Sequence, residues 1–219
     1  MCDEIDTGVD SLILHRDAGR VPRPWRNAYP GGFFHVGTRG NNKQAVYADG
    51  VDRYWFLEML GKAVFKYRWF VYAYCLMTNH YHVVVHIPEG GLSEGVCELN
   101  GGFARWSNSR HRRCDHLFGK RFGSSEITTD EHLLEACRYV VLNPVRAGVV
   151  DRPEDWIWSS YAACAGIDYP PLWLASEKVL RLFSPRPHDA RRQYRRFVRN
   201  GLLGDGPGRV PGTTRKEAG

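Results

Sequence analysis

Two histidines stand one residue apart, His80 and His82, within the apolar and β-branched stretch Leu76–Val85. Alternate side chains of a β-strand point to the same face, so a strand here would project both imidazoles together. Two imidazoles at adjacent same-face positions can bind one divalent cation, which then needs one more ligand and a substrate oxygen. The same spacing also suits two polar residues on the solvated face of a half-buried strand. The chemical interpretation therefore depends on what else the chain brings to this face.

A tyrosine and an asparagine four residues apart, Tyr139 and Asn143, offer the remaining chemistry. Residues four apart are neighbours on one helical face. Pro144 disfavours the α conformation of the residue before it, so we expect the helix to end near Asn143. Laid across the open face of a sheet, this helix could aim the tyrosyl oxygen at a cation held by His80 and His82. The Asn143 amide oxygen would be a hard third ligand, which suits Mg²⁺ or Mn²⁺ better than zinc. The structural alternatives are a packed core tyrosine and an asparagine that caps the helix.

The elements that must position these side chains follow from the periodicity of the apolar residues. Strands are predicted over 33–39, 69–77, 80–86 and 122–127, and helices over 51–67, 92–110 and 129–142. Asp49 is the expected N-cap of the first helix, and Thr129 or Asp130 that of the third. The order β-α-β-β-α-β-α indicates the α+β class, with a ferredoxin-like split β-α-β antiparallel sheet and helices on one face.

Positive charge gathers in the last forty residues of the chain. The net charge is +6, and from Arg181 onward ten Lys or Arg stand against three acids, so the preceding residues are close to neutral. In a helix expected over 189–201, Arg191, Arg195 and Arg199 form one stripe opposite an apolar face, and Gly201 can close the end. Such a helix would dock its apolar side and turn its arginines to phosphate. A solvated basic helix is the alternative.

Composition excludes several other classes of protein. No apolar run approaches the roughly 18 residues that a membrane span needs, and the acidic start of the chain is unlike a signal peptide. The six cysteines are scattered without a C-x-x-C pair, which favours free thiols in a reducing compartment. We therefore expect a cytoplasmic protein.

Several motifs together resemble the REP-associated tyrosine transposases, relatives of the single-tyrosine transposases in the His-hydrophobe-His nuclease superfamily. The resemblance spans roughly residues 20–200, and its motifs lie at 34–41, 73–82, 138–148, 156–161 and 194–198. It implies that His80 and His82 bind the metal, that Tyr139 is the nucleophile and that Asn143 is the polar third ligand. The cofactor would be Mg²⁺ or Mn²⁺. One departure is Gly123, which stands where the family often has a lysine, and Lys120 could replace that charge.

The implied reaction is the cleavage and rejoining of single-stranded DNA at or beside a hairpin, through a 5′-phosphotyrosine intermediate. The implied division is a basic N-terminal arm over 1–30, a single-tyrosine transposase catalytic domain over 31–148, and a helical, Arg-rich, DNA-contacting extension over 149–219. The protein would be nucleoid-associated. The residues expected to contact DNA are Arg20, Arg23, Arg26, Arg39, Arg105, Lys120, Arg121, Arg146, Arg191, Arg195 and Arg199.

Two other functions share the same residues in part. A non-catalytic protein that binds hairpin DNA or RNA on this fold would have no need of all four site residues, and the aromatic signature of RNA-binding strands is absent from the sequence. A metal-dependent hydrolase of other phosphodiesters would use the histidines but not Tyr139. The sequence leaves open whether the protein is a monomer or a homodimer, and whether Tyr139 acts in its own subunit.

Overall fold

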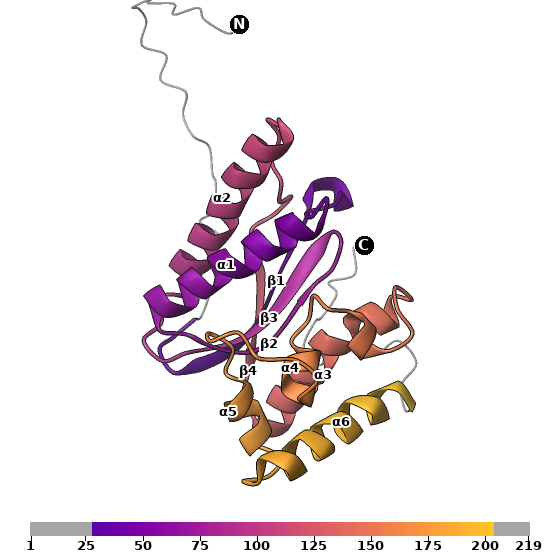
Figure 1. The fold of residues 1–219 in the computed structure, drawn as a ribbon. Coiled ribbons are helices and arrows are strands. Elements are labelled where there is room, and N and C mark those ends of the chain that lie inside the picture. The colour runs from indigo at the N-terminus through magenta and orange to yellow at the C-terminus, as the bar shows by residue number, and fades with distance from the viewer. Residues whose placement is uncertain (1–27, 204–219) are drawn as a thin grey trace, which may run out of the picture.

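A four-stranded antiparallel sheet forms the centre of the protein (Figure 1). The computed structural model describes residues 28–203. The strands β1 (Gly32–Arg39), β2 (Phe70–Leu76), β3 (His80–Ile87) and β4 (Gly123–Ile127) lie in the order β2-β3-β1-β4, and all neighbours are antiparallel. This is the arrangement of a split β-α-β fold. The predicted α+β class and ferredoxin-like sheet are confirmed.

Helices cover both faces of this sheet. The face that carries Tyr81 packs against α1 (Gly50–Tyr67) and α2 (Leu92–His111), since the Tyr81 ring meets Phe56 and its hydroxyl donates to Asn100 Oδ1 at 2.8 Å. The opposite face, with His82, receives α3 (Asp130–Arg146). The prediction of helices on one face thus holds for α1 and α2, while α3 lies across the open face, where the sequence had predicted the tyrosine helix.

Local sequence signals set most helix ends. Asp49 caps α1 by accepting from the Asp52 N–H at 3.0 Å, and Thr129 caps α3 by accepting from the His132 N–H at 3.1 Å. The predicted end of α3 near Asn143 is wrong. Pro144 has no N–H to donate, but the carbonyls of Asn143 and Pro144 still accept from the N–H groups of residues 147 and 149, both at 2.9 Å. Asn143 is therefore helical and shares one face with Tyr139.

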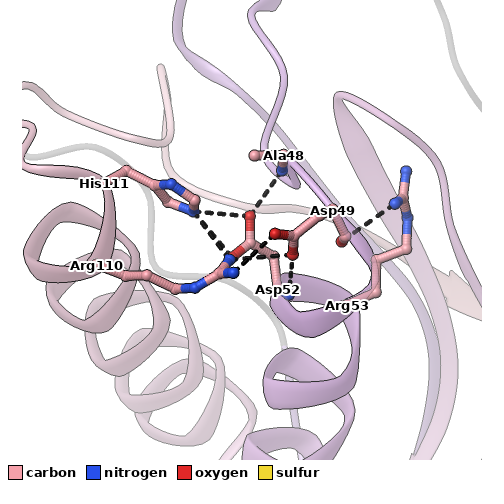
Figure 2. Close-up of polar contacts among 6 residues, drawn as sticks. All are labelled: Ala48, Asp49, Asp52, Arg53, Arg110 and His111. Atoms are coloured by element: carbon pink, nitrogen blue, oxygen red, sulfur yellow. Dashed lines mark hydrogen bonds and ion pairs between the residues drawn. The ribbon is translucent and has the colours of Figure 1, made fainter.

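A buried carboxylate ties the start of α1 to the end of α2 (Figure 2). Asp52 is fully buried and accepts from the Ala48 N–H at 2.7 Å, from His111 Nε2 at 2.9 Å and from Arg110. Arg110 also binds Asp49 through a second nitrogen at 2.7 Å. A buried carboxylate needs such partners, because removal from water without them is costly. Arg110 therefore pairs with two carboxylates of its own chain.

The C-terminal segment covers the outer edge of β2. The segment contains a short 3-10 turn η2 (Pro153–Asp155) and the helices α4 (Tyr161–Ala165), α5 (Ser176–Arg181) and α6 (Pro187–Leu203). Another 3-10 turn, η1 (Asn41–Lys43), lies elsewhere, directly after β1. The C-terminal segment bonds to β2 through the backbone. Its backbone bonds to β2 run from Leu76 N to Trp158 O, from Ser160 N to Tyr74 O and from Ala175 N to Val71 O, at 2.8–3.0 Å. An exposed strand edge can pair with other chains, and this segment satisfies it internally.

The prediction that Gly201 closes the last helix is wrong. Gly201 lies inside α6 and is buried, and a Cβ there would come within 2.7 Å of Arg138 Cδ. The glycine therefore serves the close approach of α6 to α3, not the predicted helix stop. In the part of the chain that the structure describes, no helix has both the length and the apolar character needed to cross a bilayer.

Candidate functional site

Three histidines gather on the α3 face of the sheet. His80 and His82 lie at alternate positions of β3, with ring centroids 5.0 Å apart. His35, on the neighbouring strand β1, places its Nε2 atom 2.9 Å from His82 Nδ1. His35 falls within the motif at 34–41, but it was not among the residues that the sequence singled out for the site. The sequence does show that His35 shares a strand face with Phe33 and Gly37. Only the register of β1 on β3, however, brings His35 next to His82.

A glycine makes room for the His82 ring. Gly37 pairs directly with His82, and a Cβ at position 37 would lie 3.1 Å from His82 Nδ1. Any side chain would thus press on the imidazole. The space beside these strands is an open cavity of about 320 Å³, whose lining includes His35, Gly37, Arg39, His80, His82 and residues 123–125. The cavity is wide enough to admit part of a substrate to both imidazoles.

Hydrogen bonds fix which nitrogen of each imidazole is available. His80 Nδ1 lies 2.7 Å from the Asn79 side-chain oxygen, which can only accept, so Nδ1 carries the proton and Nε2 keeps a lone pair. In the same way, His82 Nδ1 can donate to His35, which leaves His82 Nε2 as a ligand atom. Outer hydrogen bonds of this kind orient the histidines of metal sites.

Burial keeps the three rings neutral. Burial lowers the pKa of His35 to about 4, with a smaller contribution from His132. Burial also lowers the pKa of His82 well below its usual value, and His35, His80 and Arg39 add to this effect. The pKa of His80 is lowered by burial and by Arg39, and partly restored by a hydrogen bond with Asn143. At neutral pH these imidazoles therefore keep the lone pairs that a cation requires.

The third helix brings Tyr139 to the same place. The Tyr139 ring meets His35 and His82 edge-on, with centroid distances of 5.8 and 5.7 Å, and Arg146 lies over its outer face at 5.7 Å. Within residues 28–203 the Tyr139 hydroxyl makes no hydrogen bond. One turn further along, Asn143 lies near enough to His80 to raise the pKa of that imidazole. The structure thus brings together, within one chain, the four residues that the sequence singled out.

The donor set of this site fits Mg²⁺ or Mn²⁺. Among residues 28–203, no group of three or more His, Cys, Asp or Glu side chains is arranged to hold a metal ion. A cation here would instead be bound by the Nε2 atoms of His80 and His82 together with the amide oxygen of Asn143. Two neutral nitrogens and a hard oxygen leave coordination positions for phosphate oxygens and water.

The candidate DNA-contacting residues separate into groups. Arg39 and Arg146 lie beside the site. Arg105 is on α2, on the opposite side of the sheet, and Lys120 and Arg121 line a different cavity that also includes Asn100. Arg191, Arg195 and Arg199 are on α6. The predicted residues Arg20, Arg23 and Arg26 lie outside the described part of the chain.

Comparisons with known proteins show the family and the fold. Residues 33–143, which run from β1 to Asn143, match the family described as Transposase IS200 like. A Haemophilus influenzae protein that bears the name of a REP-associated tyrosine transposase is 26% identical over 113 residues, which is 46% of this chain and 64% of that protein. The chain thus spans less than two thirds of this curated relative. The solved structure of a REP-associated tyrosine transposase bound to a REP hairpin has the same fold, with a TM-score of 0.58, 18% identity, and coverage of 70% of this chain and 90% of that one.

Proposed function

This chain belongs to the IS200-like transposase family, and on that premise we propose that it cleaves and rejoins single-stranded DNA at or beside a hairpin, with Tyr139 as the nucleophile. The observation that carries the proposal is the position of the Tyr139 ring against His35 and His82 of the same chain. A tyrosine nucleophile packed against the imidazoles that would hold a cation suits phosphoryl transfer through a tyrosine. A binding protein would have no use for this arrangement.

The proposed reaction exchanges one phosphodiester for another. The Tyr139 oxygen attacks the phosphorus atom, the bond from phosphorus to the 3′-oxygen breaks, and the proton of the phenol is taken up by the departing 3′-oxygen, which becomes a hydroxyl. The products are a 5′-phosphotyrosine and a free 3′-end. Attack by another 3′-hydroxyl reverses these steps and joins strands without ATP, because the energy of the phosphodiester is kept in the tyrosine linkage.

The side chains around Tyr139 have separate tasks. His80, His82 and Asn143 would hold Mg²⁺ or Mn²⁺, which when bound neutralises charge on the non-bridging phosphate oxygens. Arg39 lines the cavity and Arg146 lies over the Tyr139 ring, and both can bind the phosphate through their guanidinium groups. His35 holds the His82 ring in the required orientation. Lys120, Arg121 and Arg105 are proposed to contact DNA farther from the reacting phosphate.

A covalent-adduct assay tests the nucleophile. End-labelled hairpin DNA with single-stranded flanks is incubated with the protein and Mg²⁺ or Mn²⁺, and adducts are separated under denaturing conditions. We expect an adduct for the native chain and none for Tyr139→Phe. The matched control is Tyr169→Phe, because Tyr169 is 93% exposed and far in sequence from the site; it should behave as the native chain does.

The other outcomes point to other functions. An adduct formed by Tyr139→Phe at the native level would rule out the nucleophile assignment. Hairpin binding without any adduct from the native chain, in either metal, would favour a non-catalytic hairpin-binding protein. Metal-dependent DNA cleavage that persists in Tyr139→Phe would favour a phosphodiester hydrolase.

A further inference from the structure

A cavity of about 530 Å³ opens between η2 and α6, in the C-terminal segment. Its walls carry five arginines together with Tyr161 and one acid, Glu154; the arginines are Arg152, Arg192, Arg195, Arg196 and Arg199. We call this space the arginine pocket. It is built from residues 152–202 and shares no lining residue with the cavity beside Tyr139.

The positive charge of the arginine pocket is only partly balanced. Arg152 binds Asp155 and Arg192 binds Asp189, each at 2.9 Å. Arg195 donates one bond, to the Ala165 carbonyl at 2.9 Å. In the described residues, no hydrogen bond or ion pair involves the guanidinium groups of Arg196 and Arg199. The pocket therefore holds two cationic groups without a counter-charge, and a third that keeps most of its donors free.

This arrangement has an energetic cost that an anion would offset. Arg192 and Arg196, and likewise Arg195 and Arg199, are four residues apart, so each pair brings like charges to one helical face. A helix that needed arginines only for solubility could spread them around its exposed side. Here they share a concave wall, where guanidinium groups can converge on one phosphate with several charge-assisted bonds.

A buried tyrosine adds a neutral hydrogen-bonding group to this wall. Tyr161 is 6% exposed, and its ring packs near Tyr194 on α6, with centroids 6.0 Å apart. Burial and then Glu154 raise its pKa, while Arg195 and Arg199 act in the opposite direction. A protonated phenol that lines the same pocket as these arginines can donate a hydrogen bond to an anion bound there.

We propose that the arginine pocket binds a backbone phosphate of the DNA substrate, at a place separate from the phosphate attacked by Tyr139. This assignment rests on the proposed function, because that function makes DNA the substrate. It also revises the stripe predicted from the helical wheel. Arg192 and Arg196 line the pocket beside Arg195 and Arg199. Arg191 does not line it, and its Cδ lies 2.7 Å from where a Cβ of residue 166 would be.

Binding measured without a divalent metal tests the pocket apart from the chemistry. Fluorescence anisotropy of labelled hairpin DNA in EDTA is followed over a range of salt concentrations. The double variant Arg196→Gln/Arg199→Gln is compared with Arg181→Gln/Arg186→Gln, which removes the same charge from exposed positions of the same segment outside the pocket. Circular dichroism and thermal unfolding establish that both variants are folded.

We expect the pocket variant alone to lose specific contacts. The slope of log affinity against log salt should flatten by about 0.7 to 0.9, the change expected for one lost phosphate contact. The control should retain the native slope. If the salt slope flattens equally in the two variants, or in neither, the proposal that the arginine pocket binds a phosphate is overturned.

Two further measurements distinguish a failure of the pocket assignment from a failure of the proposed reaction. Tight, Arg196- and Arg199-dependent binding of a free nucleoside monophosphate, with DNA affinity unchanged in the pocket variant, would assign the pocket to a small soluble phosphate and overturn the DNA assignment. The adduct assay reports on Tyr139 independently. A native chain that forms no adduct but shows the pocket-dependent salt slope would contradict the proposed reaction and leave the pocket supported.

Discussion

His35 Nε2 lies 2.9 Å from His82 Nδ1, so two adjacent strands are connected through imidazoles directly beside Tyr139. One of the two nitrogens must donate and the other accept. If His82 is to offer Nε2 to a cation, His82 Nδ1 has to be the donor. The role of His35 is then to accept this bond and hold the His82 ring in place.

Loss of this acceptor should weaken metal binding. We expect His35→Leu to lower the affinity for Mn²⁺ by about 10 to 100-fold, as removal of such outer partners does in other metal sites. His35→Gln, whose carbonyl oxygen can still accept, should retain more of the affinity. Mn²⁺ binding is measured directly by electron paramagnetic resonance, so the result does not depend on catalysis.

A histidine of β3 outside the candidate site serves as the control for that experiment. His86 lies on the α3 face but stacks on Phe33, with centroids 4.2 Å apart, at the far end of β3. His86→Phe should leave Mn²⁺ affinity at the native value. An equal loss in His86→Phe and His35→Leu would refute the specific role of His35.

Asn143 gives a separate prediction about the third ligand. Asn143→Ala removes the amide oxygen while the rest of α3 remains helical, so Mn²⁺ affinity should fall by at least roughly tenfold. Asn143→Asp restores a hard oxygen and adds a negative charge, and should bind Mn²⁺ at least as tightly as the native chain. Native affinity in Asn143→Ala would show that the amide is not a ligand.

The ion pair at the start of α1 predicts a pH dependence of stability. The hydrogen bonds from Arg110 and then from the Asp52 N–H lower the pKa of Asp49 from 3.8 to about 2. A carboxyl whose pKa is lower when folded adds stability above its unfolded pKa, and loses it as the pH falls through the folded one. This contribution should be complete above about pH 4 and vanish towards about pH 2.

The matched variant is Asp49→Asn, which keeps a side chain able to cap the helix but carries no charge. The difference in the free energy of unfolding between the native chain and Asp49→Asn is measured by urea denaturation from pH 6 down to about 2. It should be constant at the upper end and shrink below about pH 4. A difference that grows as the pH falls would contradict the ion pair.

Two helical glycines should respond to alanine in opposite directions. At Gly61, on α1, a Cβ would lie 2.6 Å from Trp173 Cδ1, so Gly61→Ala must displace the indole and should cost about 1 to 3 kcal/mol. At Gly102, on α2, the nearest atom is Met59 Sδ at 3.8 Å, so Gly102→Ala should stabilise the protein by about 0.5 to 1 kcal/mol. Urea denaturation measures both. Stabilisation by Gly61→Ala would mean that Trp173 does not pack on α1.

Features that depend on neighbouring residues were readable from the sequence. Side-chain alternation placed His80 and His82 on one face, and the helical period placed Tyr139 beside Asn143. The caps at Asp49 and Thr129 were correct because a cap is a contact within one turn. Strand ends agreed to within one residue, since the β-branched and apolar runs stop at turn residues.

Tertiary structure alone decided the relations between distant segments. The register of β1 on β3 set His35 against His82, and the packing of α3 kept Pro144 inside a helix that local preference would end. Arg110 could not be recognised as a partner of Asp52 from a sequence separation of 58 residues. Which arginines of α6 face a common pocket was likewise set by the segment they pack against. Interactions between residues close in sequence determine the periodicity and the helix caps. The contacts between distant segments arise from side chains that meet only when the core forms.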